Sequence, residues 1–86
     1  MKQEPQAVEA LALAGSILLK LGQTAEAVRV LEQAIARQPE NTEARYLLAR
    51  SYQKLGRKQD ATREFAEVER LKAQAREREK ERKPNP

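Results

Sequence analysis

The chain of 86 residues contains no cysteine, no histidine and no tryptophan. It can therefore form no disulfide, no zinc site built from thiolates or imidazoles, and no catalytic thiolate or imidazole base. Only carboxylates could hold a metal ion, and no segment has the spacing of a calcium-binding loop. The few hydroxyl groups have no activating base beside them in a known motif. We therefore predict no metal, no cofactor, no catalytic residue and no small-molecule substrate, so the protein is not expected to be an enzyme.

Long hydrophobic runs are also scarce. The apolar stretch at 10–19, ALALAGSILL, could be the core of a secretory signal. However, Lys2 is followed by Glu4 and Glu9 and not by a basic cluster, which favours a buried helix. Ten residues are too few to cross a bilayer. We therefore expect a cytoplasmic protein with no membrane partner.

The main positive signal is an internal repeat. Gly22 and Gly56 are 34 residues apart, and the same shift aligns Ala27 with Ala61 and Arg29 with Arg63. A shift that superimposes glycines, small residues and large apolar residues together is the mark of a repeated structural unit. Further pairs in this register are Glu9/Glu43, Ala10/Ala44, Leu13/Leu47, Ala14/Leu48, Gly15/Ala49, Leu18/Tyr52, Lys20/Lys54, Leu21/Leu55, Leu31/Phe65 and Ala34/Val68.

Each unit is predicted to be two helices around a short turn. Gly22 and Gly56 should each end a helix in a left-handed cap, while Pro39 ends the second helix and Asn41 caps the third. No segment alternates as a strand does. The predicted helices span 6–21, about 24–38, about 42–55, and a fourth from near Lys58. The expected fold class is all-α, an α-α superhelix of two helix-turn-helix repeats with an extended fourth helix.

The pattern Leu-Gly-x-x-x-x-Ala, followed by Leu/Phe-x-x-Ala/Val, resembles the tetratricopeptide repeat over about residues 6–72. Small residues at Gly15 and Ala49 belong to the same pattern. The resemblance implies repeats at 6–39 and 42–75 and a scaffold for protein–protein interaction. Two features depart from it. Leu11 and Arg45 occupy the position of the usual bulky aromatic, and Ala73 stands where a closing proline is expected.

The small residues are predicted to mark a close approach of paired helices. Gly15 and Ala49 should face Ala27 and Ala61. The pairs Leu18/Tyr52 and Leu31/Phe65 should fill the space on either side, as core and not as ligand contacts.

The resemblance also implies that the first helix of each unit lines a concave binding face. A peptide or partner helix with one apolar anchor and an acidic group would suit this face, because Tyr46 is expected beside Arg50 and Lys54. The alternative is that these are ordinary solvated side chains. Chaperone-adaptor members of the family grip a terminal carboxylate with Lys and Asn, but the first-unit positions here are Ala12 and Ser16, so chaperone tails are not expected. The predicted face comprises Glu9, Ala12, Leu13, Ser16, Leu19, Lys20, Glu43, Tyr46, Leu47, Arg50, Gln53 and Lys54.

The first helix is apolar almost all round, which is typical of a helix buried on several sides. Two repeats are also fewer than an independent solenoid usually needs. Either a preceding repeat or a second chain is expected to cover this helix, and we predict a homodimer or higher oligomer. The residues predicted to self-associate are Leu11, Leu13, Ile17 and Leu19.

The carboxyl-terminal end is charged. Residues 69–86 hold seven basic and four acidic side chains, and the apolar series ends at Ala75. We expect a helix to about Ala75 and a fraying, solvating tail over 76–86. The basic residues alternate with glutamate and no aromatic is present for stacking, so nucleic-acid binding is only a third hypothesis.

Overall fold

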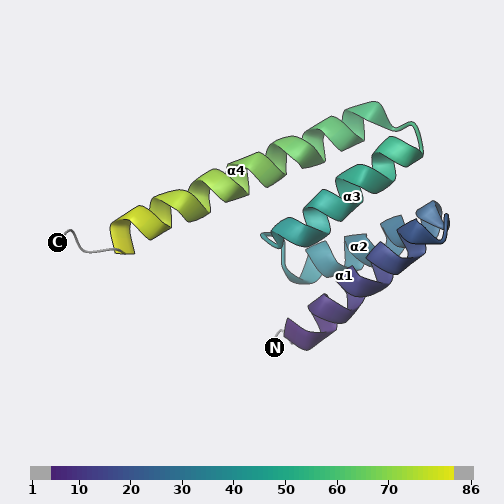
Figure 1. Cartoon of the computed structure of the whole chain (residues 1–86), viewed down its shortest axis with the longest axis horizontal. Helices are drawn as coiled ribbons and strands as arrows, with labels where there is room; N and C mark the ends of the chain where they lie inside the picture. The colour runs from purple at the N-terminus through teal and green to yellow at the C-terminus, as the bar shows by residue number, and fades with distance from the viewer. Residues whose placement is uncertain (1–4, 83–86) are drawn as a thin grey trace.

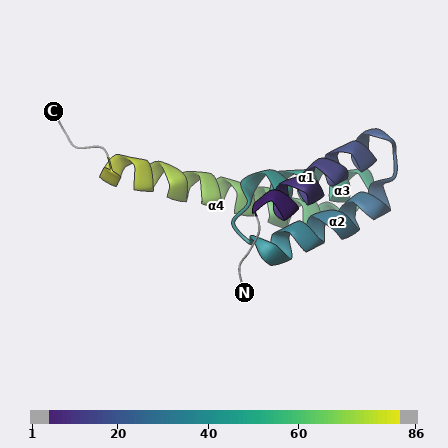
Figure 2. The same cartoon turned by 90° about the horizontal axis from the view of Figure 1, so that it is seen from below.

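A computed structural model describes residues 5–82, which form four α-helices (Figure 1). α1 and α2 make one hairpin, α3 and α4 make a second, and α2 packs on α3 to join the two (Figure 2). The described residues contain no strand, so the all-α class and the two helix-turn-helix units are confirmed. The helices are α1 (Pro5–Lys20), α2 (Thr24–Arg37), α3 (Thr42–Lys54) and α4 (Lys58–Arg82).

The turn within each hairpin is closed by a glycine. Gly22 has φ of 81° and Gly56 has φ of 78°, a left-handed conformation that glycine adopts without steric cost. After α1, the amide of Gln23 donates to the carbonyl of Leu18 at 2.8 Å, and the same bond recurs 34 residues later. These bonds satisfy carbonyls that a helix end leaves unpaired. The glycines therefore end α1 and α3 as predicted.

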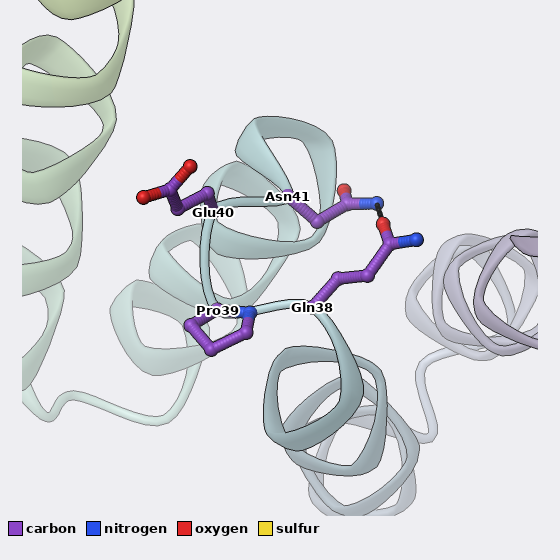
Figure 3. Close-up of a pocket in the computed structure, with 4 residues that line it drawn as sticks. All are labelled: Gln38, Pro39, Glu40 and Asn41. Carbon is purple, nitrogen blue, oxygen red and sulfur yellow. Dashed lines mark hydrogen bonds between the residues drawn. The ribbon is translucent and has the colours of Figure 1, made fainter. Parts of the chain in front are cut away.

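The turn between the hairpins is fixed by Asn41. Its Oδ1 accepts the backbone amide of Ala44 at 2.9 Å and so caps α3. Its Nδ2 donates to Oε1 of Gln38 at 3.0 Å, the bond drawn in Figure 3. Pro39 follows Gln38 and has no amide proton with which to continue α2. A side-chain cap of this kind is worth about 1 kcal/mol.

The core lies between the helices and is built largely from alanine and leucine. Leu31 of α2 is fully buried, and Tyr52 is buried at its edge. Leu18 and Phe65 are half-buried against this core. Ser51 is fully buried, but its hydroxyl donates to the carbonyl of Leu47 at 2.8 Å and so stays paired. The fully buried alanines are Ala27, Ala34, Ala44 and Ala49.

Gly15 marks the close approach of α1 to α2. A Cβ at this position would lie 2.6 Å from both Cγ and Cδ2 of Leu31. The predicted close approach is therefore confirmed, but Leu31, and not Ala27, supplies the atoms nearest to the glycine. Because Leu31 is fully buried, its side chain has no free space into which it could turn.

Gly15→Ala should destabilise the protein, although alanine is the better helix former by about 1 kcal/mol. The added methyl would overlap Leu31, and overpacking of this kind costs about 1–3 kcal/mol. We expect a net loss of about 1 kcal/mol in the free energy of unfolding, measured by urea denaturation.

A double-mutant cycle provides the control. In a Leu31→Ala background, Gly15→Ala should be neutral or stabilising, because the cavity left by the leucine accepts the methyl. All samples would contain sucrose, which favours the folded state and keeps the weakened variants folded. If Gly15→Ala lowered the free energy of unfolding equally in the wild-type and Leu31→Ala backgrounds, the packing of Leu31 against Gly15 would be contradicted.

α4 extends well beyond its hairpin partner. It is helical through Arg82, seven residues past Ala75, where fraying was predicted, and Figure 1 shows this part projecting from the bundle. Residues 72–81 are exposed, but they are mostly strong helix formers, which accounts for the continuous helix. One ion pair, Arg78 to Glu40 at 3.9 Å, links this part to the α2–α3 turn, and its exposure makes it weak. Residues 83–86 of the predicted tail lie outside the described residues.

Candidate interaction surface

A hollow of about 160 Å³ lies between α1 and α3. These helices are counterparts under the 34-residue shift, and two pairs of counterpart positions, Ser16/Arg50 and Lys20/Lys54, are among the residues that line it. All six lining residues were predicted for the concave face. They are Ser16, Leu19 and Lys20 of α1 and Leu47, Arg50 and Lys54 of α3. We call this hollow the α1–α3 groove.

The α1–α3 groove combines an apolar floor with a basic rim. Leu19 is buried and Leu47 is half-buried, while Lys20, Arg50 and Lys54 are exposed. Within residues 5–82 none of the three cations forms an ion pair. Clustered like charges around an apolar hollow raise the local concentration of anions. The groove is therefore suited to a group that carries both an apolar and an acidic part.

Some predicted residues lie elsewhere on the same helices. Glu9, Leu13, Glu43 and Gln53 are exposed but do not line the groove. Ala12 is buried and does not line the groove either. The acidic side chains lie near the amino ends of α1 and α3 and the basic ones near the carboxyl ends, so the face is acidic at one end and basic at the other.

Tyr46 is 44% exposed but does not line the α1–α3 groove. Its ring lies edge-on to Phe65 of α4, with 6.0 Å between ring centroids and 67° between ring planes. The hollow itself does not include Tyr46, and the prediction that Tyr46 lies beside Arg50 and Lys54 on the concave face stays a prediction. Tyr46 is the counterpart of Ala12. The sequence periodicity indicates on which face of α3 Tyr46 lies, but not which neighbouring helix packs against that face.

A larger hollow, of about 420 Å³, lies at the α2–α3 turn and is drawn in Figure 3. It is lined by four consecutive residues, Gln38 to Asn41, whose amide side chains bond to each other. Its single titratable side chain is Glu40. Size alone does not make it a binding site, because no second element brings a functional group to it.

A second surface consists of an apolar stripe on the outer side of α1. Leu13 is 62% exposed, Ile17 48% and Leu21 65%. Leu21 was not among the residues predicted to self-associate, although its spacing of four from Ile17 places it on the same face. We call Leu13, Ile17 and Leu21, with the exposed Ala10, the α1 stripe.

Two of the predicted self-association residues do not belong to this stripe. Leu19 is only 7% exposed and is part of the core, and Leu11 is half-buried against that core. Their assignment to a self-association surface is therefore wrong. One apolar side of α1 packs into the core, whereas the other, the α1 stripe, is exposed. Composition alone did not distinguish the two sides.

Comparison with protein-family models identifies the repeat. The model of the tetratricopeptide repeat matches residues 18–78, which is more than half of the chain and includes both glycine turns. The chain belongs to the tetratricopeptide repeat family. Comparisons with curated proteins and with solved structures give no significant match. Tetratricopeptide repeats generally mediate protein–protein interactions, and this is the general role of the protein.

One departure from the family pattern has a structural explanation. Arg45 stands where the repeat usually has a bulky aromatic. Its guanidinium lies 3.0 Å from the carboxylate of Glu64 on α4, and its Nε donates to the carbonyl of Pro39 at 2.9 Å. Both members of the ion pair are largely shielded from water, so Arg45 joins α3 to α4 by charge where an aromatic would do so by packing.

In this tetratricopeptide repeat protein, Tyr52 connects the two hairpins. Its hydroxyl donates to Oε2 of Glu32 at 3.3 Å, and the guanidinium of Arg57 lies 4.6 Å from its ring centroid. Burial raises the pKa of Tyr52 above its ordinary 10.0, and the Glu32 carboxylate raises it further, while Arg57 acts in the opposite direction.

This pKa shift predicts a loss of stability at high pH. Because the phenol holds its proton more tightly in the folded state, its contribution is complete below about pH 10 and is lost as pH rises through the folded pKa. The difference in free energy of unfolding between the wild type and Tyr52→Phe should therefore shrink above about pH 10. Urea denaturation across this pH range measures it, and a difference that stays constant or grows would contradict the assignment.

Two further observations concern the described residues. No three acidic side chains within 5–82 come together as a metal site. None of the helices in that range is long and apolar enough to span a membrane. The cytoplasmic location stays a prediction.

Proposed function

We propose that this protein is a non-catalytic interaction module that binds a peptide or a partner helix in the α1–α3 groove. Its repeats would comprise residues 6–39 and 42–75. The observation that carries the proposal is that the first helices of both units together line one hollow with an apolar floor and three cations.

The size of the groove favours a side chain of a macromolecule over a metabolite. Small-molecule pockets commonly have volumes of about 300–1,000 Å³, whereas this hollow measures about 160 Å³. One leucine-sized side chain could rest on Leu19 and Leu47. An acidic group beside it would reach Arg50, whose planar guanidinium can hold a carboxylate through two parallel hydrogen bonds.

A random heptapeptide library displayed on phage would test this proposal. Peptides selected on the protein should be enriched in an apolar residue with one or two acidic residues near it. In spectra of ¹⁵N-labelled protein, a selected peptide should shift the amides of the groove residues of α1 and α3. Arg50→Glu and Lys54→Glu should each weaken binding by about tenfold at low salt, because a charge-assisted contact becomes a repulsion.

Lys72→Glu is the matched control, because it makes the same charge change at an exposed site on α4 outside the groove. Binding should survive it. Selected peptides without acidic enrichment, or amide shifts confined to other surfaces, would contradict the proposal.

A second candidate function is self-association through the first helix, giving a homodimer or higher oligomer without a foreign ligand. The observation that favours it is the exposure of Leu13 and Ile17 on one face of α1 and of Leu21 directly after its end. Full burial of a leucine is worth about 1.5–3 kcal/mol, so a stripe of three large apolar side chains is a substantial driving force. The molar mass at high concentration, measured by light scattering, tests it.

A further inference from the structure

The α1 stripe has a covered counterpart in the second unit. Under the 34-residue shift, Ala10 corresponds to Ala44 and Ile17 to Ser51, and both counterparts are fully buried in α3, which packs against α2 and α4. Leu13 corresponds to Leu47, which is half-buried. Apart from Leu55, the exposed counterpart of Leu21, the same face is thus covered in the second unit and open in the first, and the open copy is the more apolar of the two.

The last helix of another copy is a poor cover for this stripe. Two covered apolar positions of α2, Val28 and Ile35, correspond on α4 to Thr62 and Glu69, which are exposed. If α4 took the place of α2 on a neighbouring α1, it would bury the Glu69 carboxylate against leucines. An unpaired buried charge is strongly unfavourable. Head-to-tail stacking of copies is therefore disfavoured.

Charge complementarity indicates a different partner. Glu9 and Lys20 are 11 residues apart, about 16 Å along a helix that rises 1.5 Å per residue. At 100° per residue, both lie within about 40° of Leu13 and on the same side of it. The stripe is thus flanked along one edge by an acid near its amino end and a base at its carboxyl end. On a second α1 that runs antiparallel to the first, the acid and the base occur in the opposite order along the interface, so that each acid would face a base.

We propose that α1 docks antiparallel on α1 of a second copy of this chain, with Leu13 and Ile17 at the centre and each Glu9 facing the partner's Lys20. The proposal rests on self-association, the second candidate above, and adds its partner surface and direction. The two-fold axis that relates the antiparallel helices keeps the charged edges of both copies on the same side of the dimer. The α1–α3 grooves of the two copies would therefore open side by side.

Charge-reversal variants of the exposed pair provide the test, with the dimer dissociation constant measured by sedimentation equilibrium at low salt. Glu9→Lys alone and Lys20→Glu alone should each raise the dimer dissociation constant about tenfold, because both attractive pairs become repulsive. An equimolar mixture of the two variants should form a heterodimer at least as tight as the wild-type dimer, because every facing pair is then opposite in charge. Circular dichroism verifies that each variant is folded.

A second pair of variants tests the apolar centre. Leu13→Asp should abolish dimerisation, and Leu55→Asp is the matched control because Leu55 is also an exposed leucine, 42% exposed, but lies at the carboxyl end of α3, outside the stripe. Loss of the dimer in both variants, or in neither, would overturn the role given to the stripe.

The remaining outcomes separate this proposal from the one on which it rests. A wild-type dimer that is insensitive to the charge reversals would leave self-association standing and overturn the antiparallel docking. If the Glu9→Lys variant paired preferentially with the wild type, Glu9 would face Glu9 of the other copy, as in parallel helices. This result would also overturn the antiparallel docking. A monomer at millimolar concentration would overturn both. Peptide binding is judged separately, through Arg50 and Lys54.

Discussion

The packing of Leu31 into the space left open by Gly15 controls how near α1 lies to α2, and the geometry of both surfaces depends on that distance. Any side chain at Gly15 would displace Leu31, which is buried against the rest of the core. Moving α1 outward would also move Leu19, the floor of the groove, away from Leu47. A residue with no side chain thus determines the depth of a groove that it does not line.

The local features of the fold could be predicted from the sequence because each has a local cause. Gly22, Gly56, Pro39 and Asn41 fix the helix ends through backbone conformation and capping, which depend on a few neighbouring residues. The six residues that line the groove were among the positions expected from the family resemblance, which places the first helix of each unit on one face. The extension of α4 was only partly predicted, because the strong helix formers after Ala75 have no apolar face from which to judge order.

The predictions were incomplete or wrong at positions whose neighbouring helices differ between the first and second units. Tyr46 was expected beside Arg50 and Lys54, but the contact that its ring makes is with Phe65 of α4, which the sequence did not indicate. Leu11 and Leu19 were assigned to an outer surface because an apolar helix does not reveal which of its sides the rest of the chain already covers. Periodicity describes a helix in isolation, whereas burial depends on tertiary neighbours that differ between the first and second units.

The projecting part of α4 has a practical consequence. At 1.5 Å per residue the whole of α4, with 25 residues, extends about 37 Å, nearly twice the length of the 13-residue α3 beside it. A spectroscopic label attached at Lys80 would therefore sit clear of the α1–α3 groove, yet remain fixed in orientation by an unbroken helix. The protein thus carries its own rigid spacer, through which it could be immobilised or observed without obstructing either of its surfaces.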